Sequence, residues 1–267
     1  MIQSLLNSFR GILLGPVIAK QIIAQKQTEL NWEITNEKII IDLIQKETIS
    51  PETCQTIISK DEEIISGEFI LKILPLILFF HETEYLLSEQ LATISKHINL
   101  TEEVIQEVVL FRQIINLILE NKENLLQNIC NLSQSLEKVQ NLLNNQTPLT
   151  EIKRQFREKK VLNSNYLLLS LYCFARTPDN FKLSILQASQ FNHPLILGIT
   201  AALSGGYNGY SGISIPWRLT MSLDNENNLR EQQITQLWKK WVGVDDPFKI
   251  IRPVKNQVIN PVKINNR

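Results

Sequence analysis

Few side chains in this 267-residue sequence combine the type and the spacing that catalysis or metal binding requires. The three histidines, which could act as bases or ligands near neutral pH, are far apart along the chain: His81, His97 and His193. The three cysteines are an odd number without a Cys-x-x-Cys pair, which argues against a disulfide framework and a zinc site: Cys54, Cys130 and Cys173. A phosphate-binding loop, a His-Glu-x-x-His motif and a nucleophile elbow are also missing. We expect buried, reduced cysteines and structural or surface histidines.

Glycine is concentrated in one segment of the chain. Five of the nine glycines lie between residues 198 and 212, in a stretch whose other residues follow a helical pattern. A glycine inside a helix costs about 1 kcal/mol relative to alanine, so the cluster indicates that the backbone closely approaches another helix or a ligand. Ala201, Ala202 and Ser204 extend the same small surface. Tight helix packing is the explanation that we favour.

The elements that must position these residues are predicted to be helices. Apolar residues recur at helical spacing in nearly every segment, and the alternation typical of strands is almost absent. In residues 101–121 the apolar side chains fall on one face, and Thr101 can cap the first turn. Ser50-Pro51 and Thr177-Pro178 each place a hydroxyl before a proline, which predicts two helix starts. The predicted fold class is all-α.

The sequence predicts one compact multi-helix domain over residues 1–220, followed by a C-terminal helix and an extended basic tail over residues 221–267. Trp238 and Trp241 are spaced i, i+3 in the C-terminal helix, and we expect them to dock onto the domain. From Pro247 onward the chain has five basic residues and no acidic residue. This composition is typical of an extended segment.

Charge and hydropathy exclude two classes of partner. The 27 Lys and Arg residues balance the 27 Asp and Glu residues, so no overall field attracts nucleic acid or an anionic membrane. The longest apolar run, residues 69–80, is well short of the roughly 20 residues that span a bilayer. The N-terminal segment lacks the basic start and the cleavage site of a signal peptide. We expect a cytoplasmic protein that binds neither nucleic acid nor membrane, in which the charged run 151–160 is a solvated helix face.

Four motifs, in order over residues 8–218, resemble those of the ADP-ribosylglycohydrolase family. The stretch 201-AALSGGYNG-209, followed by Ile-Pro-Trp-Arg at 215–218, is similar to the family's C-terminal small-residue helix and the Ile-Pro after it. Residues 9–15 resemble the opening Arg-Gly-x-Leu-x-Gly helix. Residues 66–82 resemble the segment that ends Met-Arg-x-x-Pro-Leu-Gly, with Lys72 in place of the arginine and Pro75 retained. Residues 171–181 resemble the helix pair before the C-terminal metal motif.

The resemblance implies an all-α orthogonal bundle of the ADP-ribosylglycohydrolase type and, because the family has many bacterial members, a bacterial cytosol. Such a protein holds two magnesium ions in a cleft and cleaves the glycosidic bond that joins ADP-ribose to a protein side chain or a small molecule. Two Asp-rich clusters hold the ions in the family. Carboxylates suit this role because they supply most of the charge that makes magnesium give up its water and bind.

The corresponding positions in this sequence lack those acids. The second cluster falls on Asn192, His193 and Pro194. The first lies within residues 32–42, in one of two registers: anchored on Trp32, the acids become Ile34 and Thr35, and anchored on Thr35, they become Asn36 and Glu37. The family's Gly-Asp after the opening helix appears as Ala-Lys. Lys20 is either simply solvated or points into the cleft, where a cation would repel magnesium or take the place of one ion.

Three hypotheses follow from this pattern. The first is a pseudoenzyme that binds a protein partner or an ADP-ribose-like ligand. The second is a scaffold whose old cleft is filled by Ile34, Phe191 and Leu195. The third is a hydrolase that survives with a single metal or with a metal-free acid-base pair from Glu37, Glu68, Asn192 and His193. We favour the pseudoenzyme or scaffold, with no confident catalytic residue, no metal ligand and no cofactor. The predicted remnant of the cleft comprises Lys20, Ile34, Thr35, Asn36, Glu37, Glu68, Asn192, His193 and Tyr207.

Overall fold

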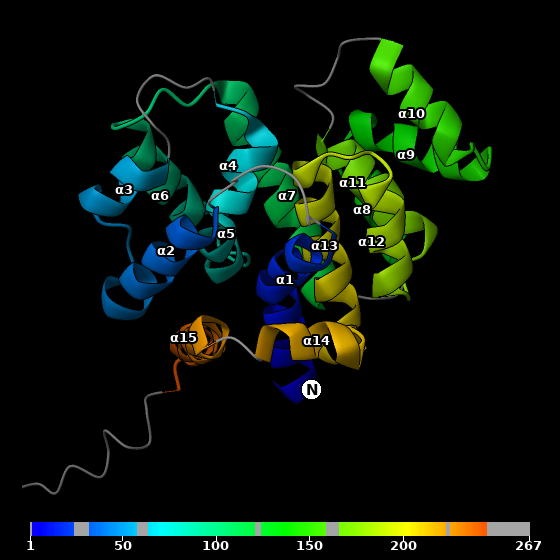
Figure 1. Cartoon of the computed structure of the whole chain (residues 1–267). Coiled ribbons are helices and arrows are strands. Elements are labelled where there is room, and N and C mark those ends of the chain that lie inside the picture. The colour runs from blue at the N-terminus through cyan, green and yellow to red at the C-terminus, as the bar shows by residue number, and fades with distance from the viewer. Residues whose placement is uncertain are drawn as a thin grey trace, which may run out of the picture.

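The structure is a computed structural model that describes residues 2–23, 32–57, 64–120, 124–158, 166–222 and 225–244. These ranges form fifteen α-helices and one short 3-10 turn and contain no strand, which confirms the predicted all-α class (Figure 1). The elements, in chain order, are α1 (Ile2–Ile23), α2 (Trp32–Lys46), α3 (Pro51–Ile57), α4 (Ser66–Lys72), α5 (Leu74–Phe79), α6 (Glu84–Ser95), α7 (Glu102–Glu120), α8 (Leu125–Cys130), α9 (Gln134–Asn144), α10 (Leu149–Glu158), α11 (Tyr166–Arg176), α12 (Phe181–Ser189), α13 (Pro194–Asn208), η1 (Tyr210–Gly212), α14 (Ile215–Ser222) and α15 (Asn225–Val242).

Helices α1 and α13 pack against each other at the centre of the bundle (Figure 1). Their backbones meet at glycine: a methyl group added to Gly205 would fall on the carbonyl oxygen of Gly11, and one added to Gly11 would fall on that of Gly205. One helical turn away, Gly15 lies in the same way against the carbonyl of Ala201. The glycine cluster therefore serves close helix packing, as predicted.

The other helices lie on two sides of this central pair. Helices α2 to α6 lie on one side and α8 to α12 on the other, with α4, α7, α11 and α12 in direct contact with α13 (Figure 1). The apolar run at residues 69–80 is buried in this arrangement and is divided at Ile73, because Pro75 cannot continue α4 and instead occupies the first turn of α5. None of the described helices combines the length and the apolar character needed to cross a membrane.

Two of the three predicted helix starts are confirmed. The hydroxyl of Ser50 accepts a hydrogen bond from the backbone N–H of Thr53 at the start of α3, and Thr101 does the same at the start of α7. The predicted start at Thr177 is wrong. Its hydroxyl bonds to Ser184, and Asn180 caps α12 by accepting a hydrogen bond from the backbone N–H of Leu183, three residues after Asn180.

The tryptophans of α15 dock onto the bundle, as the sequence predicted. Trp238 is buried, and the ring of Trp241 lies 6.1 Å from the ring of Phe9 and 5.0 Å from that of His81. His81 is buried and its Nδ1 donates a hydrogen bond to the carbonyl of Leu78, because a carbonyl can only accept. Helix α15 contacts α1, α2, α5 and α14. The predicted basic tail lies outside the described residues.

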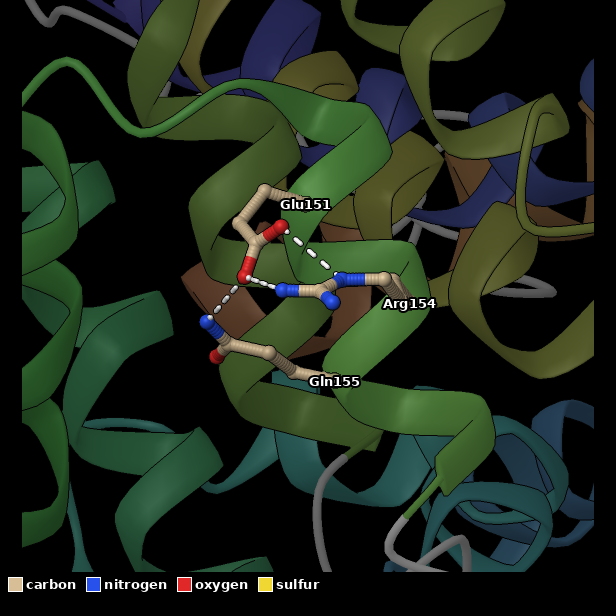
Figure 2. A network of polar contacts seen from close by, with 3 residues as sticks. All are labelled: Glu151, Arg154 and Gln155. Carbon is tan, nitrogen blue, oxygen red and sulfur yellow. Dashed lines mark hydrogen bonds and ion pairs between the residues drawn. The ribbon is translucent and has the colours of Figure 1, made fainter.

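The cysteines and the described part of the charged run also follow the predictions, whereas residues 159 and 160 lie outside the described residues. All three cysteines are free and buried, and burial raises the pKa of the Cys173 thiol to about 12. In α10, Ile152 faces the core, while the exposed side chains of Arg154 and Gln155 both donate hydrogen bonds to Glu151 (Figure 2). A helix with one apolar face toward the core and one polar face toward solvent is typical of the surface of a bundle.

Candidate functional site

Lys20 lies near the end of α1, against the start of α2. Its ammonium nitrogen is 2.9 Å from Oε1 of Glu33 and 5.2 Å from the ring centre of Trp32. The other oxygen of the same carboxylate, Oε2, is 3.4 Å from a guanidinium nitrogen of Arg230 in α15. One carboxylate is therefore shared by two cations, and all three side chains are mostly shielded from solvent. We call Lys20, Trp32, Glu33 and Arg230 the cation cluster.

The four residues of α2 that cover both alignment registers point in different directions. Ile34 is 55% exposed, whereas Thr35 is buried and donates its hydroxyl hydrogen to the carbonyl of Thr56 at 3.3 Å. Glu37 is exposed and accepts a hydrogen bond from Gln233 of α15 at 3.3 Å. Successive helical residues are rotated by about 100°, so four in a row do not share one face. This geometry disperses the side chains of α2.

Asn36 ties α2 to the end of α4. When its side-chain amide is oriented so that the nitrogen faces hydrogen-bond acceptors, Asn36 donates to the backbone carbonyls of Leu71 (2.9 Å) and Lys72 (2.6 Å). These carbonyls belong to the last turn of α4, and the carbonyls of a last turn have no N–H partner within their own helix. In the same helix Glu68 and Lys72 form an ion pair of 2.7 Å. Asn36 and Glu68 thus both have structural roles in the described contacts.

Asn192 and His193 form the turn that starts α13. Asn192 is exposed and has a φ of +51°, a left-handed conformation that asparagine tolerates better than most residues. His193 is the N-cap: the backbone N–H of Leu195 points to its Nδ1 at 3.4 Å, and its ring lies 4.6 Å from that of Tyr166. Burial lowers the pKa of His193, which favours the neutral imidazole that can accept this hydrogen bond. Pro194 begins the helix.

Tyr207 lies at the opposite end of α13. Fourteen residues separate it from His193, which corresponds to about 21 Å along the helix axis. Its ring packs edge-on against Phe174 at 5.7 Å, and burial, together with nearby Asp179, raises the pKa of its hydroxyl. The structure therefore does not bring Tyr207 together with the turn at Asn192.

The residues proposed to fill the old cleft behave differently from one another. Leu195 is buried and Phe191 is half-buried against the core, but the exposed position of Ile34 contradicts a filling role for that residue. Leu71 of α4 fills the space beside α13 instead, since a methyl group added to Gly198 would lie 2.7 Å from Leu71 Cδ1. The sequence prediction missed Leu71, although its place within a continuous apolar run marked it as a core residue.

The side chains that the resemblance aligns with the family's metal ligands do not fit two magnesium ions. Magnesium requires several oxygen ligands, most of them charged, whereas Lys20 is a cation, Asn36 presents its nitrogen to backbone carbonyls, and the hydroxyl of Thr35 is donated elsewhere. Across the described ranges, no group of three or more His, Cys, Asp or Glu side chains is placed to hold a metal ion.

Sequence reasoning missed two members of the cation cluster, Glu33 and Arg230. Glu33 carried a weak signal, because an acid in the first turn of a helix is favourable whether or not it has another role. Arg230 carried none, since its pairing depends on how α15 packs on α2. Comparisons with protein-family models and with curated proteins found no match to this chain.

Proposed function

We propose that this protein is a pseudoenzyme related to the ADP-ribosylglycohydrolases, in which the two-magnesium centre has been replaced and binding has succeeded hydrolysis. Its partner is a protein or an ADP-ribose-like ligand, and its place of action is the cytoplasm. The resemblance of the four sequence motifs supports the family, and the cation cluster supports the loss of the metals. The cluster is the observation that carries the proposal.

The charge of the cation cluster supports the replacement. Lys20 and Arg230 place two positive charges beside the carboxylate of Glu33. A unit charge repels another at 4 Å by about 4 kcal/mol at the effective dielectric constant near a protein surface. A divalent cation at this place would meet that repulsion and would compete with two cations for a single carboxylate.

Among the described residues, the other acids of the predicted cleft do not supply a second set of ligands or a free acid-base pair. Glu68 is paired with Lys72, and Glu37 receives a hydrogen bond from α15 on the exposed face of α2. His193 uses its ring nitrogen as a helix cap. The polar groups of the old cleft thus hold helices α1, α2, α4, α13 and α15 in place, which is the role expected of a binding or scaffold protein built on an enzyme frame.

The experiment that tests this proposal is an assay for release of ADP-ribose from proteins modified on arginine or serine. We expect no release above a protein-free blank with Mg²⁺, with Mn²⁺ or with a chelator. Glu37→Gln and Glu68→Gln serve as the diagnostic variants. Release by the wild-type chain that either variant abolishes would overturn the proposal in favour of a surviving hydrolase.

A further inference from the structure

A groove of about 630 Å³ lies between helices α8, α9 and α11, on the side of the bundle away from α2 and α15 (Figure 1). Its volume falls within the range of about 300–1,000 Å³ typical of sites for small ligands. Helix α11 runs between the groove and the side of the bundle that holds the cation cluster. It begins at Tyr166, beside His193, and ends at Arg176, about 15 Å further along the helix axis. The groove is therefore a site distinct from the old cleft.

Side-chain amides make up much of the groove wall. Gln127, Gln140, Asn144 and Gln146 line it together with apolar side chains such as Leu126 and Leu143. Each amide has both hydrogen-bond donors and an acceptor, and so matches both the N–H and the C=O of a peptide group. Peptide groups carry no charge, and neither do these side chains. The apolar part of the lining suits a side chain of the bound segment.

Tyr172 fixes one wall of the groove. Its hydroxyl donates a hydrogen bond of 2.6 Å to the carbonyl of Thr147, and this bond ties the connection between α9 and α10 to α11. Gln146, the preceding residue, has a φ of +48° and lines the groove. The backbone beside Gln146 is thus held by a buried side chain of α11, which limits how far this part of the wall can move.

Among the described residues that line the groove, Arg176 is the only charged one. Its guanidinium carbon lies 5.8 Å from the ring centre of Tyr172, and among the described residues no carboxylate pairs with it. Arg154 of α10 makes the contrast clear, because both of its bonding nitrogens contact Glu151 of the same helix, at 3.0 and 2.8 Å (Figure 2). The described residues that line the groove include no Asp or Glu, so a carboxylate beside Arg176 would meet a cation and no repelling acid among them.

We propose that this groove binds a short extended peptide of a partner protein, with the amide side chains on the peptide backbone and Arg176 on a carboxylate of the peptide. This site is independent of the proposed loss of hydrolysis. The carboxylate comes from an acidic side chain or from the C-terminus of the partner. Recognition of an extended chain by backbone hydrogen bonds and a pocket for one side chain is an established physical mode of peptide binding.

The test uses the full chain and random seven-residue peptides in two libraries, one with free and one with amidated C-termini. Sequences enriched on the wild-type protein are synthesised and titrated by fluorescence polarisation. We expect enrichment, with at least a tenfold loss of affinity for Arg176→Gln, equivalent to about 1.4 kcal/mol, and a further loss for Gln140→Leu. Enrichment in the free library alone identifies a C-terminal carboxylate, whereas acidic residues enriched in both libraries identify a side chain.

The matched controls are Arg154→Gln and Gln155→Leu, which make the same chemical changes on the exposed face of α10. These variants should bind the selected peptides with wild-type affinity. Circular dichroism and urea unfolding of each variant separate a loss of binding from a loss of folding, because Arg176 also lies in the last helical turn, where a cation stabilises the helix. No enrichment in either library, or equal affinities for wild type and Arg176→Gln, would overturn the proposal.

Discussion

Replacing Gly205 by alanine should destabilise the protein, because this residue lies where α1 and α13 come closest. The added methyl group would overlap the carbonyl oxygen of Gly11, and backbone atoms cannot rotate out of the way as a side chain can. Overpacking a tight interior costs about 1–3 kcal/mol, and a clash with backbone belongs at the upper end. Alanine regains about 1 kcal/mol through its higher helix propensity. We expect a net loss of about 2 kcal/mol in the free energy of unfolding.

The control for this prediction is Gly198→Ala in the same helix. Its methyl group would meet Cδ1 of Leu71 at 2.7 Å, but this atom is the end of a flexible side chain that can move. The gain in helix propensity therefore offsets most of the cost, and we expect a change within about 1 kcal/mol of wild type. Urea unfolding measures the free energy of unfolding of both variants, and unchanged m-values show that stability alone has changed. A Gly205→Ala protein as stable as wild type, or less affected than Gly198→Ala, would refute the close approach of these helices.

Three further predictions follow from the described contacts. Burial holds the pKa of His81 below its ordinary value of 6.5, so the unfolded chain binds a proton at a higher pH than the folded chain does. The free energy of unfolding should therefore keep its full value above pH 6.5 and fall below it, by at most about 1.4 kcal/mol per pH unit for this group. A His81→Asn protein whose stability falls as steeply with pH between pH 7 and 5.5 as that of the wild type would contradict this. Trp241→Ala should cost about 2 kcal/mol of unfolding free energy, because it removes the ring packed on Phe9 and His81. The control Val242→Ala, at the exposed neighbouring residue, should change the unfolding free energy by less than about 0.5 kcal/mol. Equal effects of the two substitutions would argue against docking of α15. Glu33→Gln should cost about 1 kcal/mol, since Lys20 and Arg230 lose their shared carboxylate, and this cost should shrink at high salt; an effect independent of salt would exclude an electrostatic cause.

The fold was predictable where it depends on neighbours in the sequence. Apolar periodicity identified the helices, and the hydroxyls of Ser50 and Thr101 marked helix starts because a cap acts over three residues. The start at Thr177 failed for an equally local reason. Two candidate caps stand three residues apart, and the asparagine at 180 caps the helix while the threonine hydroxyl bonds to Ser184.

The candidate site was less predictable because its contacts join distant parts of the chain. The motifs singled out Lys20 and Asn36, yet neither periodicity nor motif could show that Asn36 donates to the carbonyls in the last turn of α4. Glu33 and Arg230 meet only because α15 returns across α2. The position of Tyr207 in the C-terminal motif suggested a cleft residue, whereas the length of α13 separates it from the turn at Asn192.

The most direct test of the proposed loss of a magnesium centre is a calorimetric titration of the protein with ADP-ribose, performed once with Mg²⁺ and once with a chelator. Under the proposal, Lys20 and Arg230 stand in place of the divalent ions, so the two titrations should be identical, whether or not ADP-ribose binds. A titration whose affinity or heat depends on Mg²⁺ would contradict the account.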